Sequence, residues 1–216
     1  MEAISSKHLL TNLLLIFASS FTTLCANKAI QTPHQEASTL FIRTSCSFTT
    51  YPRLCYTSLA RHAELIQTNR VLLTGAALNV TLASAKSTAA VVSMMAKSQG
   101  LKPREVAAMK DCVEVLSDSV DELRRSIDGM THLRTSNFEM TMSDLQTWVS
   151  AALTDENTCT DGFQESATAT ATAAAATTTT TIAGTNTKTR VRGLVVQVAQ
   201  LTSNALALIN QLANQG

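Results

Sequence analysis

Apolar residues recur at alternating steps of three and four along four segments of the chain. This spacing places them on one face of an α-helix, and such a face has to be covered by another apolar surface. The chain has only 7 glycines and 3 prolines, and aromatic residues make up 4% of it, which argues against a β-sandwich. We therefore expect an all-α protein in which four helices form an antiparallel four-helix bundle.

Each of the four segments carries its own row of apolar side chains. The first row consists of Leu78, Leu82, Ala85, Ala89, Val92 and Ala96. The second consists of Val106, Met109, Val113, Leu116, Val120, Leu123, Ile127 and Met130. The third consists of Phe138, Met142, Leu145, Val149 and Ala152, and the fourth of Val191, Leu194, Val198, Leu201, Ala205, Leu208 and Leu212. Since the rows are apolar throughout, we expect a core without a buried polar cluster that would hold a small ligand.

Residues that end and start helices lie between the rows. Gly100 suits the end of the first bundle helix, and Pro103 suits the first turn of the next one. The stretch SNFE, from Ser136 to Glu139, has the pattern of a capping box at the start of a helix. We expect the bundle to span residues 69–215.

The first 26 residues have the layout of a secretory signal peptide. Lys7 lies in a short polar start, and an apolar run from Leu9 to Phe17 leads to small residues before Ala26. This run is shorter than the roughly 20 residues that a membrane-spanning helix needs, and we expect no later segment to be apolar enough to span. We therefore predict removal of residues 1–26, a flexible segment over residues 27–37, and a secreted protein with no membrane partner.

Four cysteines remain after the signal peptide, and they are Cys46, Cys55, Cys112 and Cys159. An even number of cysteines in an oxidising compartment predicts disulfides, although four cysteines allow three pairings. The turn-like TTYP between Cys46 and Cys55 favours a bond between these two, across the turn of a helical hairpin at residues 38–68. A bond between the other two would cross-link two bundle helices. Zinc is disfavoured because its ligands are normally two to four residues apart.

The stretch from residue 166 to residue 189 consists mainly of alanine and threonine and carries no apolar row. Threonine is a modest helix former, and a stretch of this composition is typical of a flexible linker. We expect an insertion between the last two bundle helices, and O-glycosylation or recognition as the alternative.

Charge is unevenly distributed along the chain. Residues 28–104 contain nine basic and two acidic residues, a balance of +7, whereas residues 105–161 contain four basic and twelve acidic residues, a balance of −8. The acids of the second bundle helix are expected to point away from the core, and they include Asp111, Glu114, Asp118, Asp121 and Glu122. They form either a solvated surface or a docking surface for a basic partner. Nucleic acid is disfavoured because the basic residues lie on separate elements without aromatic neighbours.

The sequence shows little that would carry out chemistry. No histidine pair has helical metal-ligand spacing, and no phosphate-binding glycine loop, GxSxG or HExxH motif is present. We therefore predict a protein with no catalytic residues, no metal and no cofactor. One N-x-S/T match, from Asn79 to Thr81, predicts N-glycosylation of Asn79 in a secreted chain.

Four stretches resemble the plant invertase/pectin methylesterase inhibitor family, and they are FIRTSCSFTTYPRLCYTSLA, AMKDCVEVLSDSVDELRRS, WVSAALTDENTCTDGF and LTSNALALI. The resemblance spans residues 38–212 and includes four cysteines in matching order and spacing. It implies an N-terminal helical hairpin on a four-helix bundle, with Cys46 bonded to Cys55 and Cys112 bonded to Cys159. The alanine- and threonine-rich stretch departs from the family pattern, in which this loop is short and charged.

The resemblance also implies a function. One branch of the family inhibits pectin methylesterases, which remove methyl esters from cell-wall homogalacturonan, and the other inhibits acid invertases, which hydrolyse sucrose. The invertase branch carries a Pro-Lys-Phe tripeptide that enters the enzyme's active site, and this sequence lacks it. The chain is therefore more similar to the pectin methylesterase inhibitors, and inhibition of an acid invertase is the alternative. Because no esterase domain follows Gly216, we expect a free-standing inhibitor.

Membership of that branch implies an enzyme inhibitor of the apoplast and cell wall rather than an enzyme. It implies a monomer that forms a 1:1 complex with a pectin methylesterase, with the bundle covering the substrate cleft of the enzyme. Many of these partner enzymes are basic, which fits a docking role for the acidic helix.

Overall fold

The computed structural model describes residues 33–171 and 182–214, with side chains for residues 33–163 and 187–214. Within these ranges the chain contains helices and no strands. The chain divides into two units, Met1–Glu36 and Ala37–Gly216. The expected signal peptide, residues 1–26, lies outside the described residues, and all packing described below lies within the unit that begins at Ala37.

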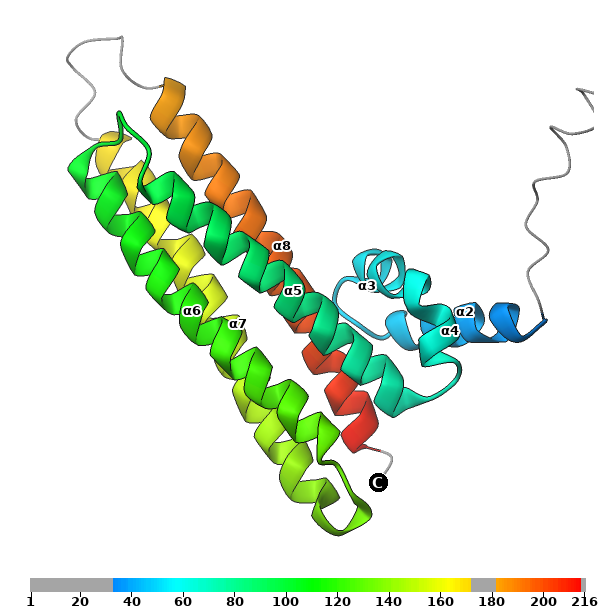
Figure 1. Ribbon diagram of the computed structural model, residues 1–216. Helices are drawn as coiled ribbons and strands as arrows, with labels where there is room; N and C mark the ends of the chain where they lie inside the picture. The colour runs from blue at the N-terminus through cyan, green and yellow to red at the C-terminus, as the bar shows by residue number, and fades with distance from the viewer. Residues whose placement is uncertain (1–32, 172–181, 215–216) are drawn as a thin grey trace, which may run out of the picture. The chain divides into compact units, whose positions relative to one another are not determined.

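Four long helices make up most of this unit (Figure 1). They are α5 (Arg70–Ala96), α6 (Pro103–Thr131), α7 (Phe138–Ala171) and α8 (Ile182–Ala213). α5 packs against α6 and α8, and α7 also packs against α6 and α8. Short connections make α5, α6 and α7 antiparallel neighbours. The predicted all-α four-helix bundle is confirmed.

A helical hairpin precedes the bundle, as expected. It consists of α2 (Pro33–Cys46) and α3 (Pro52–Leu59), and the short helices η1 (Ala60–His62) and α4 (Ala63–Ile66) lead from it to α5. Because α2 begins at Pro33, the interval 27–37 that was expected to be flexible already contains helix. Proline suits a first helical turn because its φ is fixed near the helical value and its missing N–H would have no partner there.

Two disulfides connect these helices. One joins Cys46 at the end of α2 to Cys55 in α3, with 5.5 Å between the Cα atoms. The other joins Cys112 of α6 to Cys159 of α7, with 4.5 Å between the Cα atoms. All four cysteines are buried. The structure therefore has the pairing that the family resemblance implied, with one bond inside the hairpin and one across the bundle.

One buried asparagine fixes the turn of the hairpin to α8. Asn204 Oδ1 accepts a hydrogen bond from the backbone N–H of Tyr51 at 2.9 Å, and Asn204 Nδ2 donates to the Tyr51 carbonyl at 3.0 Å. The asparagine is only 3% exposed. A further bond, from Gln211 Nε2 to the carbonyl of Ser45 at 3.2 Å, ties the end of α2 to the same helix. These bonds give the hairpin a defined position on the bundle.

The buried face of α6 differs from the predicted row. Leu116 is completely buried as expected, whereas Val113 is only half-buried. The burial extends instead toward a row of small side chains, and these are Cys112, Ser119 and Ser126. Small side chains allow neighbouring helices to approach closely, so α6 turns this side toward the core.

The buried faces of α5 and α8 also contain residues that the predicted rows omit. On α8, Val195 is completely buried and Leu194 is half-buried, although only the leucine was in the predicted row. On α5, the threonines Thr74, Thr81 and Thr88 are buried at intervals of seven residues. The Thr81 hydroxyl donates to the carbonyl of Ala77 at 2.8 Å, so it needs no partner on another helix. The core is more polar than the sequence rows indicated.

Helices α7 and α8 both extend into the alanine- and threonine-rich stretch of residues 166–189. α7 continues to Ala171, and α8 begins at Ile182. The expectation of a linker without helix is therefore wrong at both ends of this stretch. Extending an existing helix needs no new nucleus, and alanine is the strongest helix former. Residues 172–181 lie outside the described part of the chain.

The stretch Thr187–Ala213 of α8 is long and apolar enough, by length and composition, to cross a membrane. The expectation that no later segment meets this criterion is therefore wrong. The same stretch supplies buried core residues, which include Val191, Val198, Ala205 and Leu212. We interpret its apolar character as that of a core helix of the bundle.

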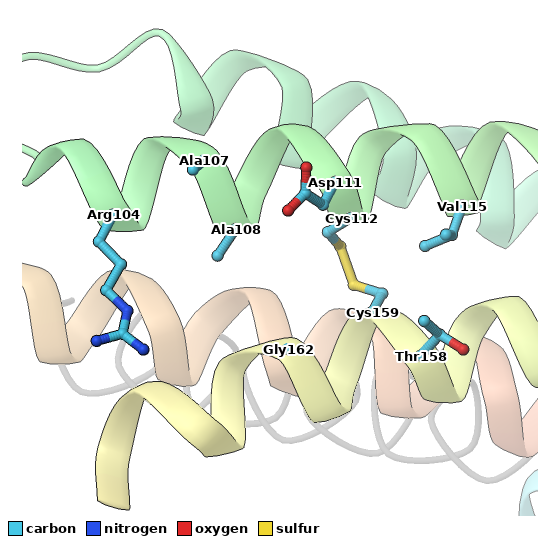
Figure 2. Close-up of a pocket in the computed structure, with 9 residues that line it drawn as sticks. All are labelled: Arg104, Ala107, Ala108, Asp111, Cys112, Val115, Thr158, Cys159 and Gly162. Atoms are coloured by element: carbon cyan, nitrogen blue, oxygen red, sulfur yellow. A yellow bond between two sulfur atoms is a disulfide. The ribbon is translucent and has the colours of Figure 1, made fainter. Parts of the chain in front are cut away.

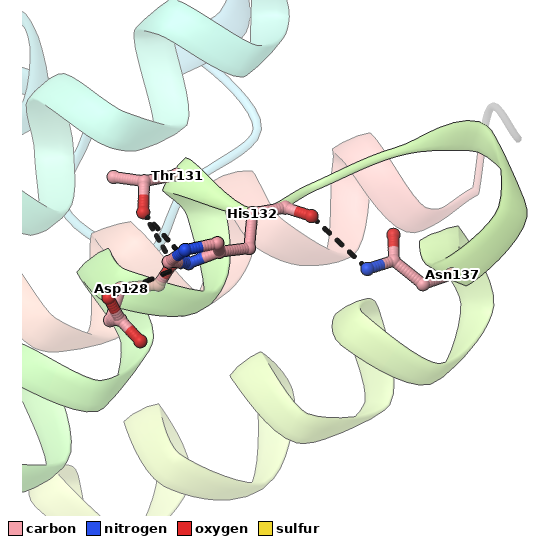
Figure 3. Close-up of polar contacts among 4 residues, drawn as sticks. All are labelled: Asp128, Thr131, His132 and Asn137. Atoms are coloured by element: carbon pink, nitrogen blue, oxygen red, sulfur yellow. Dashed lines mark hydrogen bonds and ion pairs between the residues drawn. The ribbon is translucent and has the colours of Figure 1, made fainter.

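Asn137 holds the turn between α6 and α7. Its Oδ1 accepts a hydrogen bond from the backbone N–H of Arg134 at 2.7 Å. Its Nδ2 donates to the carbonyl of His132 at 3.1 Å (Figure 3). The capping box expected at Ser136 and Glu139 does not form between these two described residues. The asparagine side chain provides the turn with the polar partners that the capping box would have supplied.

We expect Gly193→Ala to stabilise the protein by about 0.5–1 kcal/mol, because alanine has a higher helix propensity than glycine. Gly193 lies inside α8, and a Cβ there would meet nothing within 4 Å. Gly129→Ala is the matched comparison in α6, since a Cβ there would lie 3.3 Å from a ring carbon of Trp148. Urea unfolding should show a clear gain for Gly193→Ala and a smaller gain or a loss for Gly129→Ala. Equal gains would contradict the difference in packing.

We expect Asn204→Ala to destabilise the protein by about 1–3 kcal/mol, because the N–H of Tyr51 would lose its acceptor at a part-buried position, while the Tyr51 carbonyl would keep only the N–H of Cys55 as a donor. Ser203→Ala is the control, since its hydroxyl makes one exposed contact of 3.3 Å with Thr50 Oγ1. The control should change stability by less than about 0.5 kcal/mol. Thermal unfolding followed by circular dichroism measures both. If the two variants unfold at the same temperature, Asn204 does not anchor the hairpin.

Candidate functional site

The acids of α6 form the most strongly charged surface that the sequence predicted. We call Asp111, Glu114, Asp118, Asp121 and Glu122 the acidic face. The first four are exposed, as expected for residues on the outer side of the helix. Their spacing of three or four residues brings the carboxylates close to one another along one side of α6.

Two of the five acids are neutralised by arginines of the same helix. Asp121 pairs with Arg124, and Glu122 pairs with Arg125 at 3.3 Å. No ion pair involves Asp111, Glu114 or Asp118 among the residues that the structure describes. The uncompensated negative charge therefore lies in the first half of the acidic face. The sequence alone did not distinguish these two halves.

Glu122 was expected to point away from the bundle, but it does not. Its side chain is only 21% exposed, and its Oε2 atom is buried without a hydrogen-bond partner in the described structure. Glu122 lies three residues after Ser119, which is part of the buried row of small side chains. Because α6 turns this row toward the core, Glu122 is brought to the boundary between α6 and α7 rather than to the outer side.

Asp155 of α7 lies close to the acidic face. Partial burial raises its pKa above the ordinary value, and the negative charges of Asp118 and Glu122 raise it further. Three carboxyl groups therefore gather where α6 meets α7. Such a cluster repels further negative charge and favours a cationic group from a partner.

A shallow hollow of about 260 Å³ lies next to this surface, over the Cys112–Cys159 disulfide (Figure 2). Its α6 wall includes Asp111 and Arg104, and its α7 wall includes Gly162. The hollow exists because most of the other lining side chains are small, as Ala107 and Ala108 are. An apolar floor beside a carboxylate matches a lysine or arginine side chain, which has an apolar stem and a charged end.

A buried carboxyl group lies at the centre of the bundle, where no polar cluster was expected. Glu156 of α7 is completely buried. Its Oε1 accepts hydrogen bonds from Ser119 Oγ of α6 at 2.8 Å and from Thr202 Oγ1 of α8 at 2.9 Å, whereas its Oε2 has no partner in the described structure. Burial raises the pKa of Glu156 to about 7, although the two hydroxyl bonds act in the opposite direction.

The predicted apolar rows did not include Glu156, although the spacing of the third row extends to it. The third apolar row ends at Ala152, and the same steps of four and three continue through Glu156 to Cys159. A charged residue at such a position indicates a buried acid or the end of the apolar row, and spacing alone does not separate the two.

The remaining predicted site residue is Asn79, which lies on the exposed side of α5. Its Nδ2 donates to the carbonyl of Gly75 at 2.8 Å. In the described part of the chain, no group of three or more histidine, cysteine, aspartate or glutamate side chains is arranged to hold a metal ion.

The family model described as plant invertase/pectin methylesterase inhibitor matches residues 40–208. The chain belongs to this family. It is 43% identical to Pectinesterase inhibitor 10 of Arabidopsis thaliana over 81% of this chain and 51% of that protein. It is 40% identical to Pectinesterase inhibitor 9 of the same plant over 93% of each chain.

A crystal structure of a mutant form of a pectin methylesterase inhibitor from Arabidopsis is also similar, with a TM-score of 0.47 and 21% identity over 76% of this chain and 95% of that chain. The sequence matches confirm that this member of the family is an enzyme inhibitor rather than an enzyme. The family name covers inhibitors of two enzyme classes, so membership alone does not choose the target.

We expect Glu156→Gln to stabilise this inhibitor at neutral pH and to have little effect at acidic pH. The pKa of Glu156 is about 7 in the folded state against 4.5 for the ordinary group. Above pH 4.5 the unfolded chain loses this proton while the folded chain keeps it, so the folded state becomes less stable as the pH rises to about 7. The full cost is about 3 kcal/mol, and glutamine removes it because it does not ionise.

Urea unfolding at pH 4 and at pH 7.5 measures the effect, and Asp144→Asn on the same helix is an exposed control. The gain from Glu156→Gln should be larger by about 3 kcal/mol at the higher pH, whereas the control should show no such difference. A pH-independent effect of Glu156→Gln would mean that this carboxyl group ionises normally in the fold.

Proposed function

We propose that the chain inhibits a pectin methylesterase by covering its substrate cleft in a 1:1 complex, and so limits the demethylesterification of cell-wall homogalacturonan. The observation that carries this proposal is the 40% identity to Pectinesterase inhibitor 9 over 93% of both chains. A match of this extent leaves out few residues of either chain. The inhibitor acts through a surface, so it needs no catalytic group of its own.

The inhibitor works outside the cell, in the apoplast and cell wall. Two observations support this part of the proposal. Both disulfides join buried cysteines, and disulfides persist in oxidising compartments. The first 26 residues have the composition of a signal peptide.

The first half of the acidic face is the docking surface for the enzyme. Asp111, Glu114 and Asp118 are exposed and form no ion pair among the described residues, although Arg104 lines the same hollow as Asp111. A basic enzyme surface would be attracted to them, and the hollow beside Asp111 would accept one of its lysine or arginine side chains. Asp121 and Glu122 contribute less because arginines neutralise them.

Titration of the purified inhibitor against a pectin methylesterase and an acid invertase, in parallel, tests the target class. We expect loss of pectin methylesterase activity to reach its end point at one inhibitor per enzyme. Inhibition of the invertase alone would assign the chain to the other enzyme class of its family.

Neutralising the docking surface should slow association. We expect Glu114→Gln together with Asp118→Asn to lower the association rate several-fold at low salt, because opposite charges speed up encounter. The difference from wild type should disappear at 1 M salt, where the screening length falls to about 3 Å. Stopped-flow or surface plasmon resonance measurements give the rates.

Glu64→Gln together with Asp144→Asn is the matched control. It also removes one glutamate and one aspartate charge at exposed positions, but on α4 and α7. We expect the control to associate faster than the α6 variant at low salt. If the two double variants associate equally fast, net charge alone is responsible and the enzyme does not dock on this part of α6.

A further inference from the structure

An open groove of about 560 Å³ lies between α5 and the short helices η1 and α4 that precede it. Arg61 and His62 of η1 and Leu65 of α4 form one side, and the α5 side includes Leu72 and Gly75. The volume falls within the range of roughly 300–1,000 Å³ that is usual for small-molecule sites. The function proposed above makes no use of this groove.

The groove combines exposed apolar side chains with unused polar donors. Leu65 is 67% exposed and Leu72 is 43% exposed. The side chains of Arg61 and His62 have no hydrogen-bond or ion-pair partner among the described residues. Gly75 contributes no side chain, and a Cβ there would meet nothing within 4 Å, so the groove is open at this point.

The acceptor of the glycosylation motif lines the same groove. Asn79 lies one turn after Gly75 on α5, and it is exposed. A group attached to Asn79 Nδ2 would therefore start at the edge of the groove, beside the open space over Gly75. Because the attachment is covalent, even weak contacts with the groove would be made at a high effective concentration.

We propose that the first N-acetylglucosamine of an N-linked glycan on Asn79 lies in this groove and covers the exposed side chains of Leu65 and Leu72. A sugar ring has apolar C–H faces and an outer ring of hydroxyl groups. The leucines match the faces, and Arg61 and His62 supply donors for the hydroxyls. This inference rests on the secretion proposed above.

The attachment step leaves the asparagine able to keep its present hydrogen bond. In the secretory pathway the sugar comes from a lipid-linked oligosaccharide diphosphate. The bond from the sugar C1 to the diphosphate oxygen breaks, a bond from C1 to Asn79 Nδ2 forms, Nδ2 loses one proton to a base, and the lipid diphosphate leaves. The remaining N–H is sufficient for the 2.8 Å bond to the carbonyl of Gly75.

The modification has to precede the folding of α5. Thr81, the third residue of the motif, is 1% exposed, and its hydroxyl donates to the carbonyl of Ala77. An enzyme that reads this threonine needs it accessible, so it acts on the chain before the helix is packed. The sugar is then present when η1 and α4 pack on α5, and the groove forms around it.

The test uses the full chain secreted from a yeast host that leaves high-mannose glycans. Endoglycosidase H leaves one N-acetylglucosamine on the asparagine, whereas peptide N-glycosidase F removes the whole glycan and converts Asn79 to aspartate. Intact mass identifies each product, and Asn79→Asp made without a glycan is the reference for the second one. We expect the single sugar to retain the melting temperature of the glycoprotein, and complete removal to lower it by about 2–4 °C.

Two variants separate groove binding from a general effect of glycosylation. Asn79→Gln together with Lys86→Asn moves the motif two turns along α5, beyond the groove, where Thr88 is 5% exposed and so resembles Thr81. Removing the glycan from this variant should leave the melting temperature unchanged. Leu65→Ser should abolish the gain from the sugar at Asn79 without changing the melting temperature of the sugar-free protein.

Three results would overturn the inference, and they are distinguishable from failure of the proposed function. A secreted chain whose mass shows no glycan rejects the site, and a chain retained in the cell without a glycan rejects both secretion and the site. An equal change in melting temperature with the glycan at either position rejects the groove as its location. Inhibition of pectin methylesterase is measured on the same samples, so loss of inhibition with an intact sugar effect rejects only the inhibitory function.

Discussion

The bundle depends on one continuous buried row along α7. This row runs through Met142, Leu145, Val149, Ala152, Glu156, Cys159 and Phe163, and each is no more than 4% exposed. α7 packs against both α6 and α8, so the row contributes to two helix interfaces at once. It also carries the cysteine that is bonded to α6 and the carboxyl group that accepts from α6 and α8. The packing, the cross-link and the polar centre of the bundle therefore share one element.

Glu156 determines how the helices are aligned along their axes. Ser119 and Thr202 meet the same carboxyl oxygen from two different helices. Sliding α6 or α8 along α7 by one turn would move a hydroxyl by about 5.4 Å and leave the acid with one partner fewer. An apolar residue would pack in several registers at similar cost, because apolar contacts are not directional. The acid lowers stability at neutral pH, but it makes one alignment better than the others.

The sequence predicted most of the fold because the four apolar rows and the cysteine spacing are strong signals. They identified four helices and a hairpin, and the turn at Pro52 favoured the Cys46–Cys55 bond. The rows were less successful in showing which side of each helix faces the core. On α6 the valines of the row are mostly at the edge, and Ser119 and Ser126 lie inside. Hydropathy does not favour small polar residues for the core, but close helix packing does.

The side of α6 that faces the core also explains what the sequence missed in the candidate site. Whether an acidic side chain points outward or is half-buried depends on which side of α6 faces the core. The predicted orientation was therefore wrong for Glu122 and correct for Asp118. Pairing was also not predictable, since an arginine three residues away is available to several acids and the side-chain conformation decides between them. The groove beside Asn79 requires η1 and α4 to pack on the start of α5, and the spacing of apolar residues does not show how such short helices pack.

The two proposed surfaces lie on segments of the chain that have opposite net charge. Both walls of the groove belong to residues 28–104, which carry a balance of +7, whereas the acidic face belongs to residues 105–161, with a balance of −8. A basic enzyme is repelled by the first segment and attracted by the second. The proposed glycan on Asn79 would add neutral bulk to the segment that a basic enzyme would avoid. Steric hindrance and electrostatics therefore act in the same direction, and both favour an approach of the enzyme toward α6 and α7.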